Sequence, residues 1–117
     1  MKLRVVNRPE ARVFLNVVKQ FASAIGPEEM MQIPLSRIWI IRTQRHPVAQ
    51  LARLLNQEFL LVVDAWTEQQ YYVIGDRVFE ETDQPVKGRR EIVKTDEADV
   101  VMIRGLFGRL KAIEVIR

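Results

Sequence analysis

Apolar positions recur with a helical period near the start of the chain. Between residues 8 and 25 they fall at alternating steps of one and three, at Val13, Phe14, Val17, Val18, Phe21, Ala22 and Ile25. This spacing marks one face of an α-helix. Asn7 and Glu10 have the spacing of a capping box with Pro9 in the first turn, and Gly26-Pro27 follows the last apolar position. We therefore predict a short strand over residues 2–6 and a helix over residues 8–25.

A second helix is predicted from residue 47 to about residue 56. His46-Pro47 opens it, and Val48, Leu51 and Ala52 begin its apolar face. Residues 26–35 contain two prolines and are predicted to form a loop. The β-branched and aromatic run at residues 36–42 predicts a strand.

The second half of the chain has the pattern of β-strands. Residues 59–66 are mostly apolar, as in a central strand, and Gly75-Asp76 joins residues 71–74 to 77–81 as a hairpin. Residues 82–91 are predicted to be a charged loop, and residues 100–104 and 110–116 a final hairpin. The order predicts an α+β fold: a largely antiparallel sheet with two helices packed on one face, in a single compact domain spanning residues 1–117.

Composition argues against an enzyme. The 117 residues include no cysteine and one histidine, which excludes disulfides and thiolate chemistry. Neither serine has a histidine near it in the sequence, and no glycine-rich phosphate motif is present. We expect no catalytic residue, no metal and no cofactor; catalysis would need groups supplied by a partner. Charges interrupt every long apolar stretch, so we expect a cytoplasmic protein that does not enter a membrane.

Charge is segregated along the chain. Residues 35–57 carry four arginines and no acid, whereas residues 58–84 carry seven acids against Arg77 alone. The charges of these segments either cancel within the fold or form surface patches of opposite sign. Such patches suit self-association or docking. Our first hypothesis is a non-enzymatic binding or assembly module, a small subunit that self-associates or docks into a larger complex. Its proposed interface anchors are aromatic: Trp66, Tyr71, Tyr72, Phe79 and Phe107.

The alternative hypothesis is a nucleic-acid-associated factor that contacts phosphates through a basic, arginine-rich face. Arginines beside an aromatic side chain can pair with phosphates and stack on bases. The candidate residues are Arg37, Arg42, Arg45, Arg53, Lys87, Arg89 and Arg90. Solvated arginines on a strand and a loop would give the same pattern, so both interpretations stay open.

The segment from Val101 to Ile113, with Arg104-Gly105-Leu106-Phe107 at its turn, resembles the KOW motif of NusG-type transcription factors. The strand at residues 38–43 is similar to the opening of their N-terminal domain. The resemblance implies a nucleic-acid-associated function and covers a minor part of the chain. Elsewhere the chain departs from that family, because a long helix precedes the tryptophan strand. We therefore assign no family from it.

Overall fold

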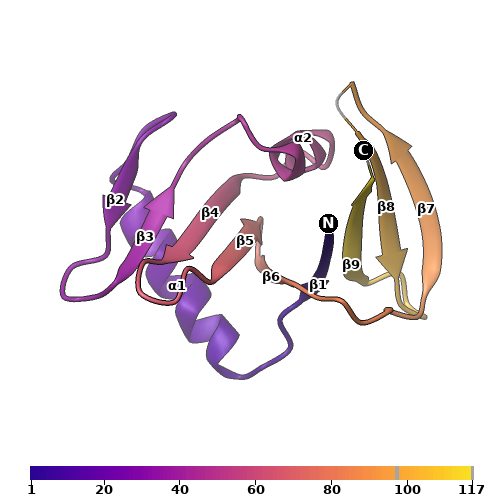
Figure 1. The fold of residues 1–117 in the computed structure, drawn as a ribbon, viewed down its shortest axis with the longest axis horizontal. Helices are drawn as coiled ribbons and strands as arrows, with labels where there is room; N and C mark the ends of the chain where they lie inside the picture. The colour runs from indigo at the N-terminus through magenta and orange to yellow at the C-terminus, as the bar shows by residue number, and fades with distance from the viewer. Residues whose placement is uncertain (97, 117) are drawn as a thin grey trace.

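A single antiparallel sheet forms the frame of the protein (Figure 1). The computed structural model describes residues 1–96 and 98–116. In this part of the chain the strands are β1 (Lys2–Val5), β2 (Met30–Gln32), β3 (Ile38–Ile41), β4 (Phe59–Asp64), β5 (Gln70–Ile74), β6 (Arg77–Glu81), β7 (Arg89–Lys94), β8 (Asp99–Arg104) and β9 (Leu110–Ile116), and the helices are α1 (Glu10–Ala22) and α2 (Pro47–Leu54). The strand order is β2-β3-β4-β5-β6-β1-β9-β8-β7. The predicted α+β class, the antiparallel sheet and the single compact domain agree with this architecture.

Strand β1 joins the two halves of the sheet. Leu3 pairs with Glu81 of β6 on one side and with Ile113 of β9 on the other. The amino group of Met1 donates a hydrogen bond to the carbonyl of Val115 at 3.0 Å. In Figure 1, β2 to β6 therefore lie on one side of β1 and β7 to β9 on the other. Leu3 is fully buried, so the junction is part of the core.

The two helices pack against opposite faces of the sheet. Phe59 of β4 belongs to the same buried cluster as Leu51 of α2. The adjacent Leu60 belongs to the cluster that contains Val18 and Ala22 of α1. Because successive strand residues point to opposite faces, the two clusters lie on the two sides of the sheet. This differs from the prediction that both helices pack on one face. The continuous apolar run of β4 explains it, since each apolar face needs its own cover.

Helix ends and hairpins follow the predictions in part. Helix α1 is shorter than predicted, and Pro9 precedes it without a side-chain capping bond, so the capping box does not form. Helix α2 begins at Pro47 as predicted, and Nδ1 of His46 accepts a hydrogen bond from the N–H of Val48 at 3.1 Å. The β5–β6 and β8–β9 hairpins form as predicted. Gly75 occupies the β5–β6 turn with a φ of 57°.

Two strands were predicted as loops. Strand β2 lies in the predicted loop over residues 26–35, and strand β7 begins inside the predicted loop over residues 82–91. Both are edge strands of the sheet. Neither strand has an apolar face like those of the central strands, so the sequence lacks the alternation of apolar and polar residues that would predict them. None of the helices in the described residues has the length and hydropathy that a bilayer crossing requires.

Candidate functional site: a cationic cavity beside helix α1

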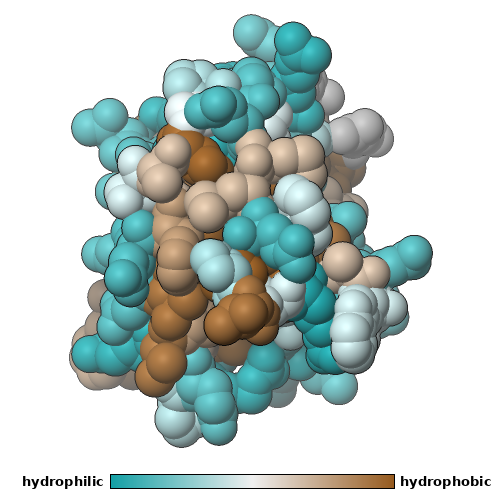
Figure 2. Space-filling view, turned by 90° about the vertical axis from the view of Figure 1, so that its left-hand side faces the viewer, coloured by the Kyte–Doolittle hydropathy of each residue, from teal (hydrophilic) through white to brown (hydrophobic). Residues whose placement is uncertain are grey.

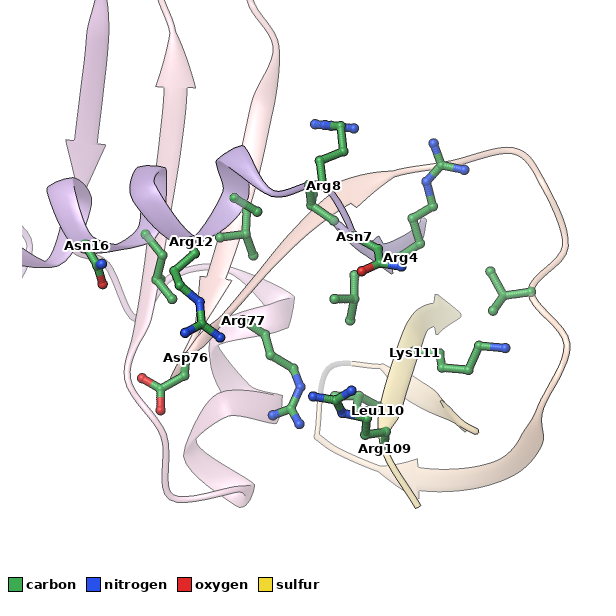
Figure 3. Close-up of a pocket in the computed structure, with 16 residues that line it drawn as sticks. Arg4, Asn7, Arg8, Arg12, Asn16, Asp76, Arg77, Arg109, Leu110 and Lys111 are labelled. Carbon is green, nitrogen blue, oxygen red and sulfur yellow. The ribbon is translucent and has the colours of Figure 1, made fainter. Parts of the chain in front are cut away.

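A cavity of about 780 Å³ lies between helix α1, strands β1 and β6, and the β8–β9 hairpin (Figure 3). Its wall combines apolar side chains with basic ones, and the described lining contains a single carboxylate, Asp76. The basic residues are Arg4, Arg8, Arg12, Arg77, Arg109 and Lys111. The cavity therefore concentrates positive charge in a concave site.

Local structure explains how these cations reach one place. Arg12 lies in the first turn of α1, and Arg8 lies in the segment that leads from β1 into the helix. Arg4 lies between Leu3 and Val5, whose side chains belong to the core on the α2 side, so Arg4 points to the opposite face. Arg77 opens β6 directly after the Gly75-Asp76 turn. The remaining two cations, Arg109 and Lys111, lie at the start of β9.

A partly buried carboxylate, Glu80, holds two of the arginines. Oε2 of Glu80 lies 3.2 Å from Nε of Arg4 and 3.3 Å from Nη1 of Arg8. The hydrogen bond and the charge of Glu80 raise the pKa of Arg8. Arg4 also donates from Nη1 to Oε1 of Gln84 at 3.2 Å. Glu80 therefore fixes the positions of both arginines beside the cavity.

Three other arginines make no such hydrogen bond or ion pair in the part of the chain that the structure describes, although the charge of Arg77 helps to lower the pKa of Asp76. In the described residues, no hydrogen bond or ion pair holds the guanidinium of Arg12, Arg77 or Arg109. Asp76 is bound by Nζ of Lys19 at 2.9 Å, outside the lining, and this contact lowers the pKa of Asp76.

Two of these guanidinium groups converge. Figure 3 shows the side chains of Arg77 and Arg109 pointing toward one another across the cavity. Like charges brought together repel, and an anion between them relieves the repulsion. Guanidinium groups also match the geometry of phosphate and carboxylate oxygens. The arrangement therefore favours an anionic ligand.

The residues of the lining do not suit a metal ion. Its cationic side chains are hydrogen-bond donors that repel a cation, and Asp76 is already bound to Lys19. Elsewhere in residues 1–96 and 98–116, no group of three histidine, aspartate or glutamate side chains is placed to hold one. The charges of the lining favour an anion over a cation.

The arginines predicted from residues 37–53 lie away from this cavity. Nε of Arg37 donates to Oδ2 of Asp64 at 2.8 Å, and its guanidinium lies 5.0 Å from the ring centroid of Trp66. Arg42 donates to the carbonyls of residues 22 and 25, at the end of α1, over 2.9 and 3.2 Å. Arg53 donates to the side chain of Gln44. These contacts give Arg37 and Arg42 structural roles, whereas Arg45 is exposed.

The predicted basic residues at positions 87–90 lie at the other end of the sheet. Nη2 of Arg90 is 3.0 Å from Oε2 of Glu114. The carbonyl of Lys87 accepts a hydrogen bond from Nζ of Lys111 at 2.8 Å, and Arg89 is exposed at the start of edge strand β7. Strand β3 is next to one edge of the sheet, and β7 is the opposite edge strand. The structure therefore does not bring the two predicted basic groups together.

Two of the predicted aromatic anchors are core residues. Tyr72 and Phe79 are 1% and 0% exposed and pack in the cluster beneath α2. Burial, together with Glu81, raises the pKa of Tyr72 to about 12. Their assignment as interface anchors is corrected here, because strands β5 and β6 turn these side chains inward.

The remaining aromatic anchors reach the surface to different degrees. The half-buried ring of Tyr71 packs against Phe14, with centroids 5.4 Å apart. Trp66 is 78% exposed and Phe107 is 93% exposed. Both can therefore meet a partner without a change in the fold.

Sequence reasoning missed the cavity because its cations are spread over the whole chain. The available signals were local ones: the spacing of Arg8 and Arg12 on one helix face, and the nearness of Arg109 to the glycine turn of the final hairpin. Neither signal shows that residues 8–12 and 109–111 meet.

Comparison with family models, with curated proteins and with solved structures found no match to this chain. The local resemblance to the KOW motif gains no support from them. The functional proposals below rest on the cavity and on the surface of the fold.

Proposed function

We propose that the protein is a nucleic-acid-binding module that holds backbone phosphates in the cationic cavity. The observation that carries the proposal is the convergence of Arg77 and Arg109, with Arg12 beside them, in a cavity whose only described carboxylate already binds Lys19. Arginine pairs with phosphate through two parallel hydrogen bonds, which makes it the usual residue for this ligand.

The number of cations favours a polyanion over a single phosphate. Six basic side chains line the cavity, and Glu80 contacts only two of them, Arg4 and Arg8. A ligand with one phosphate would leave several like charges close together. A backbone with repeated phosphates places one charge near each group of cations, and the release of its counterions drives binding.

The test is fluorescence anisotropy with a labelled single-stranded oligonucleotide at several salt concentrations. The variant Arg77→Gln with Arg109→Gln removes two charges from the cavity. We expect its salt slope to flatten by about 1.4, since each phosphate contact on a single strand contributes roughly 0.7. Competition with inorganic pyrophosphate and with a free nucleotide shows whether a small phosphorylated molecule is the preferred ligand.

The matched control is Arg45→Gln with Arg53→Gln. It makes the same change in net charge at residues that lie outside the cavity lining. We expect it to bind like the wild type. An equal loss of affinity in both double variants would show that only net charge matters, and no binding at low salt would end the proposal. Circular dichroism confirms that each variant is folded.

A second candidate function is self-association through the edges of the sheet. Strands β2 and β7 end the strand order, and an edge strand has backbone groups free to pair with another strand. Glu28 and Glu29 directly precede β2, whereas β7 carries Arg89, Arg90 and Lys94 against one acid. Pairing β7 of one copy with β2 of the next brings opposite charges together. Pairing two copies of the same edge brings like charges together.

The surface near β2 supports this second candidate. Figure 2, which views the molecule from the β2 end, shows hydrophobic side chains gathered on that face among hydrophilic ones. Met30 of β2 is 56% exposed. Leu35 and Trp66 are also largely exposed, and both line one groove. An exposed apolar surface of this kind is typical of an interaction site.

Light scattering after size exclusion tests the second candidate. We expect a mass above the 13.7 kDa of one chain, and we expect Arg89→Glu with Lys94→Glu to reduce it to that of one chain. Arg12→Glu with Arg77→Glu makes the same charge reversal in α1 and in β6, which is not an edge strand, and should leave the mass unchanged. A wild-type mass of one chain at every concentration would exclude self-association.

A further inference from the structure

The tip of the β8–β9 hairpin exposes two large apolar side chains. Leu106 and Phe107 are each 93% exposed. Exposed aromatic side chains in such a position often take part in recognition. Phe107 is one of the aromatic residues that the sequence singled out as a contact residue.

The tip is held in one shape by hydrogen bonds. The N–H of Gly105 donates to the carbonyl of Arg109 at 2.8 Å, and the N–H of Gly108 donates to the carbonyl of Gly105 at 3.0 Å. Nη1 of Arg104 donates to the carbonyl of Gly108 at 3.1 Å. Gly108 has a φ of 78°, which a residue with a side chain adopts only with strain. Phe107 is therefore presented on a defined turn.

The same hairpin contributes to the cationic cavity. Arg109 follows Phe107 by two residues, and both Arg109 and Lys111 line the cavity. Phe107 does not line the cavity itself, but its exposed ring stands on the hairpin that carries these two cations. Proteins that bind single strands combine a basic groove with aromatic side chains on which bases stack.

Resting on the proposed function, we infer that the ligand is a single-stranded nucleic acid, one of whose bases stacks on Phe107 while its phosphates occupy the cavity. The shape of the site favours this class. A duplex keeps its base faces stacked inside, and proteins read it by placing a helix or a ribbon in a groove. The cavity is concave and suits a flexible backbone, and only an unpaired base has a free face for the ring of Phe107.

Leu106 provides a matched control for Phe107. The two residues are adjacent and equally exposed, but only Phe107 has an aromatic face. Stacking therefore requires Phe107 alone. Docking of the tip into an apolar surface would use both side chains.

The experiment measures anisotropy of a labelled single strand and of its duplex with Phe107→Ala, Phe107→Trp and Leu106→Ala. We expect Phe107→Ala to weaken single-strand binding roughly tenfold, within the range for loss of one stacked base. The salt slope should stay unchanged, because no phosphate contact is lost. Phe107→Trp should retain binding, and Leu106→Ala should bind like the wild type.

The outcomes separate this inference from the proposed function. Wild-type protein that binds neither ligand would overturn both. Binding that depends on Arg77 and Arg109 but is unaffected by Phe107→Ala would overturn the stacking inference alone. Equal losses in Phe107→Ala and Leu106→Ala, or a preference for the duplex, would also overturn it and leave the cavity as a phosphate site.

Discussion

Replacing Leu51 with alanine should destabilise the protein by about 3–4 kcal/mol. Leu51 is fully buried on α2, in the cluster that also contains Tyr72, Phe79 and Ile113. The change removes three carbon atoms from the core, and at about 0.8 kcal/mol for each, their transfer accounts for about 2.4 kcal/mol. The cavity left between α2 and the sheet adds the remainder, because close-packed neighbours relax only in part.

Urea unfolding followed by circular dichroism measures this loss, and a thermal scan should show a drop of about 10–15 °C. The control is Leu54→Ala on the same helix. Leu54 is 59% exposed, so its truncation should change stability by less than about 0.5 kcal/mol. Equal effects of the two changes, or a loss below about 1 kcal/mol for Leu51→Ala, would refute the packing of α2 on this face of the sheet.

Two further predictions concern a buried carboxylate and two glycine turns. Burial opposes the ionisation of Asp64, but hydrogen bonds from the N–H groups of residues 67 and 66 and from Arg37 outweigh it and lower the pKa of Asp64 below 3.8. Ionised Asp64 stabilises the fold above pH 3.8, and this stabilisation is lost as pH falls through the folded-state pKa. Asp64→Asn should therefore have a lower urea midpoint than the wild type at neutral pH, and the difference between the two midpoints should narrow below pH 3.8. A difference that stays constant with pH would contradict this. Gly108→Ala should cost about 1 kcal/mol from its positive φ alone, since an added Cβ meets nothing within 4 Å. Gly75→Ala should cost a similar amount in the same unfolding assay, because its φ is also positive and the exposed side chain of Gln57, which the added Cβ would meet, can rotate away. A cost far above that of Gly108→Ala would contradict this reasoning.

The elements with a strong apolar period were predictable. Both helices, the central strand β4 and the two glycine-turned hairpins form where the sequence indicates them. Strands β2 and β7 were missed for a common reason. Each strand pairs with a neighbour on one side only, and the first four residues of β7 are exposed. An edge strand is stabilised by backbone pairing, which leaves little trace in the hydrophobic pattern.

The candidate site was less predictable than the fold. Sequence reasoning grouped cations that are neighbours in the chain, and several of these bind local partners, as Arg37 binds Asp64 and Arg90 binds Glu114. The cavity instead joins Arg8 and Arg12 of the N-terminal segment to Arg109 of the last hairpin. Phe107 was predicted as a contact residue from its aromatic character, but the sequence did not show that its hairpin also lines the cavity.

The amino-acid sequence alone determined where helices and hairpins form and which side of each element is apolar, because these follow from residue spacing and turn chemistry over a few positions. Tertiary structure decided which elements meet. Pairing of β1 with both β6 and β9 brings the two ends of the chain together, and the two apolar faces of the central strands place the helices on opposite sides. Strand pairing across the sheet depends on the simultaneous burial of residues that are distant in the chain, and no local pattern carries that information.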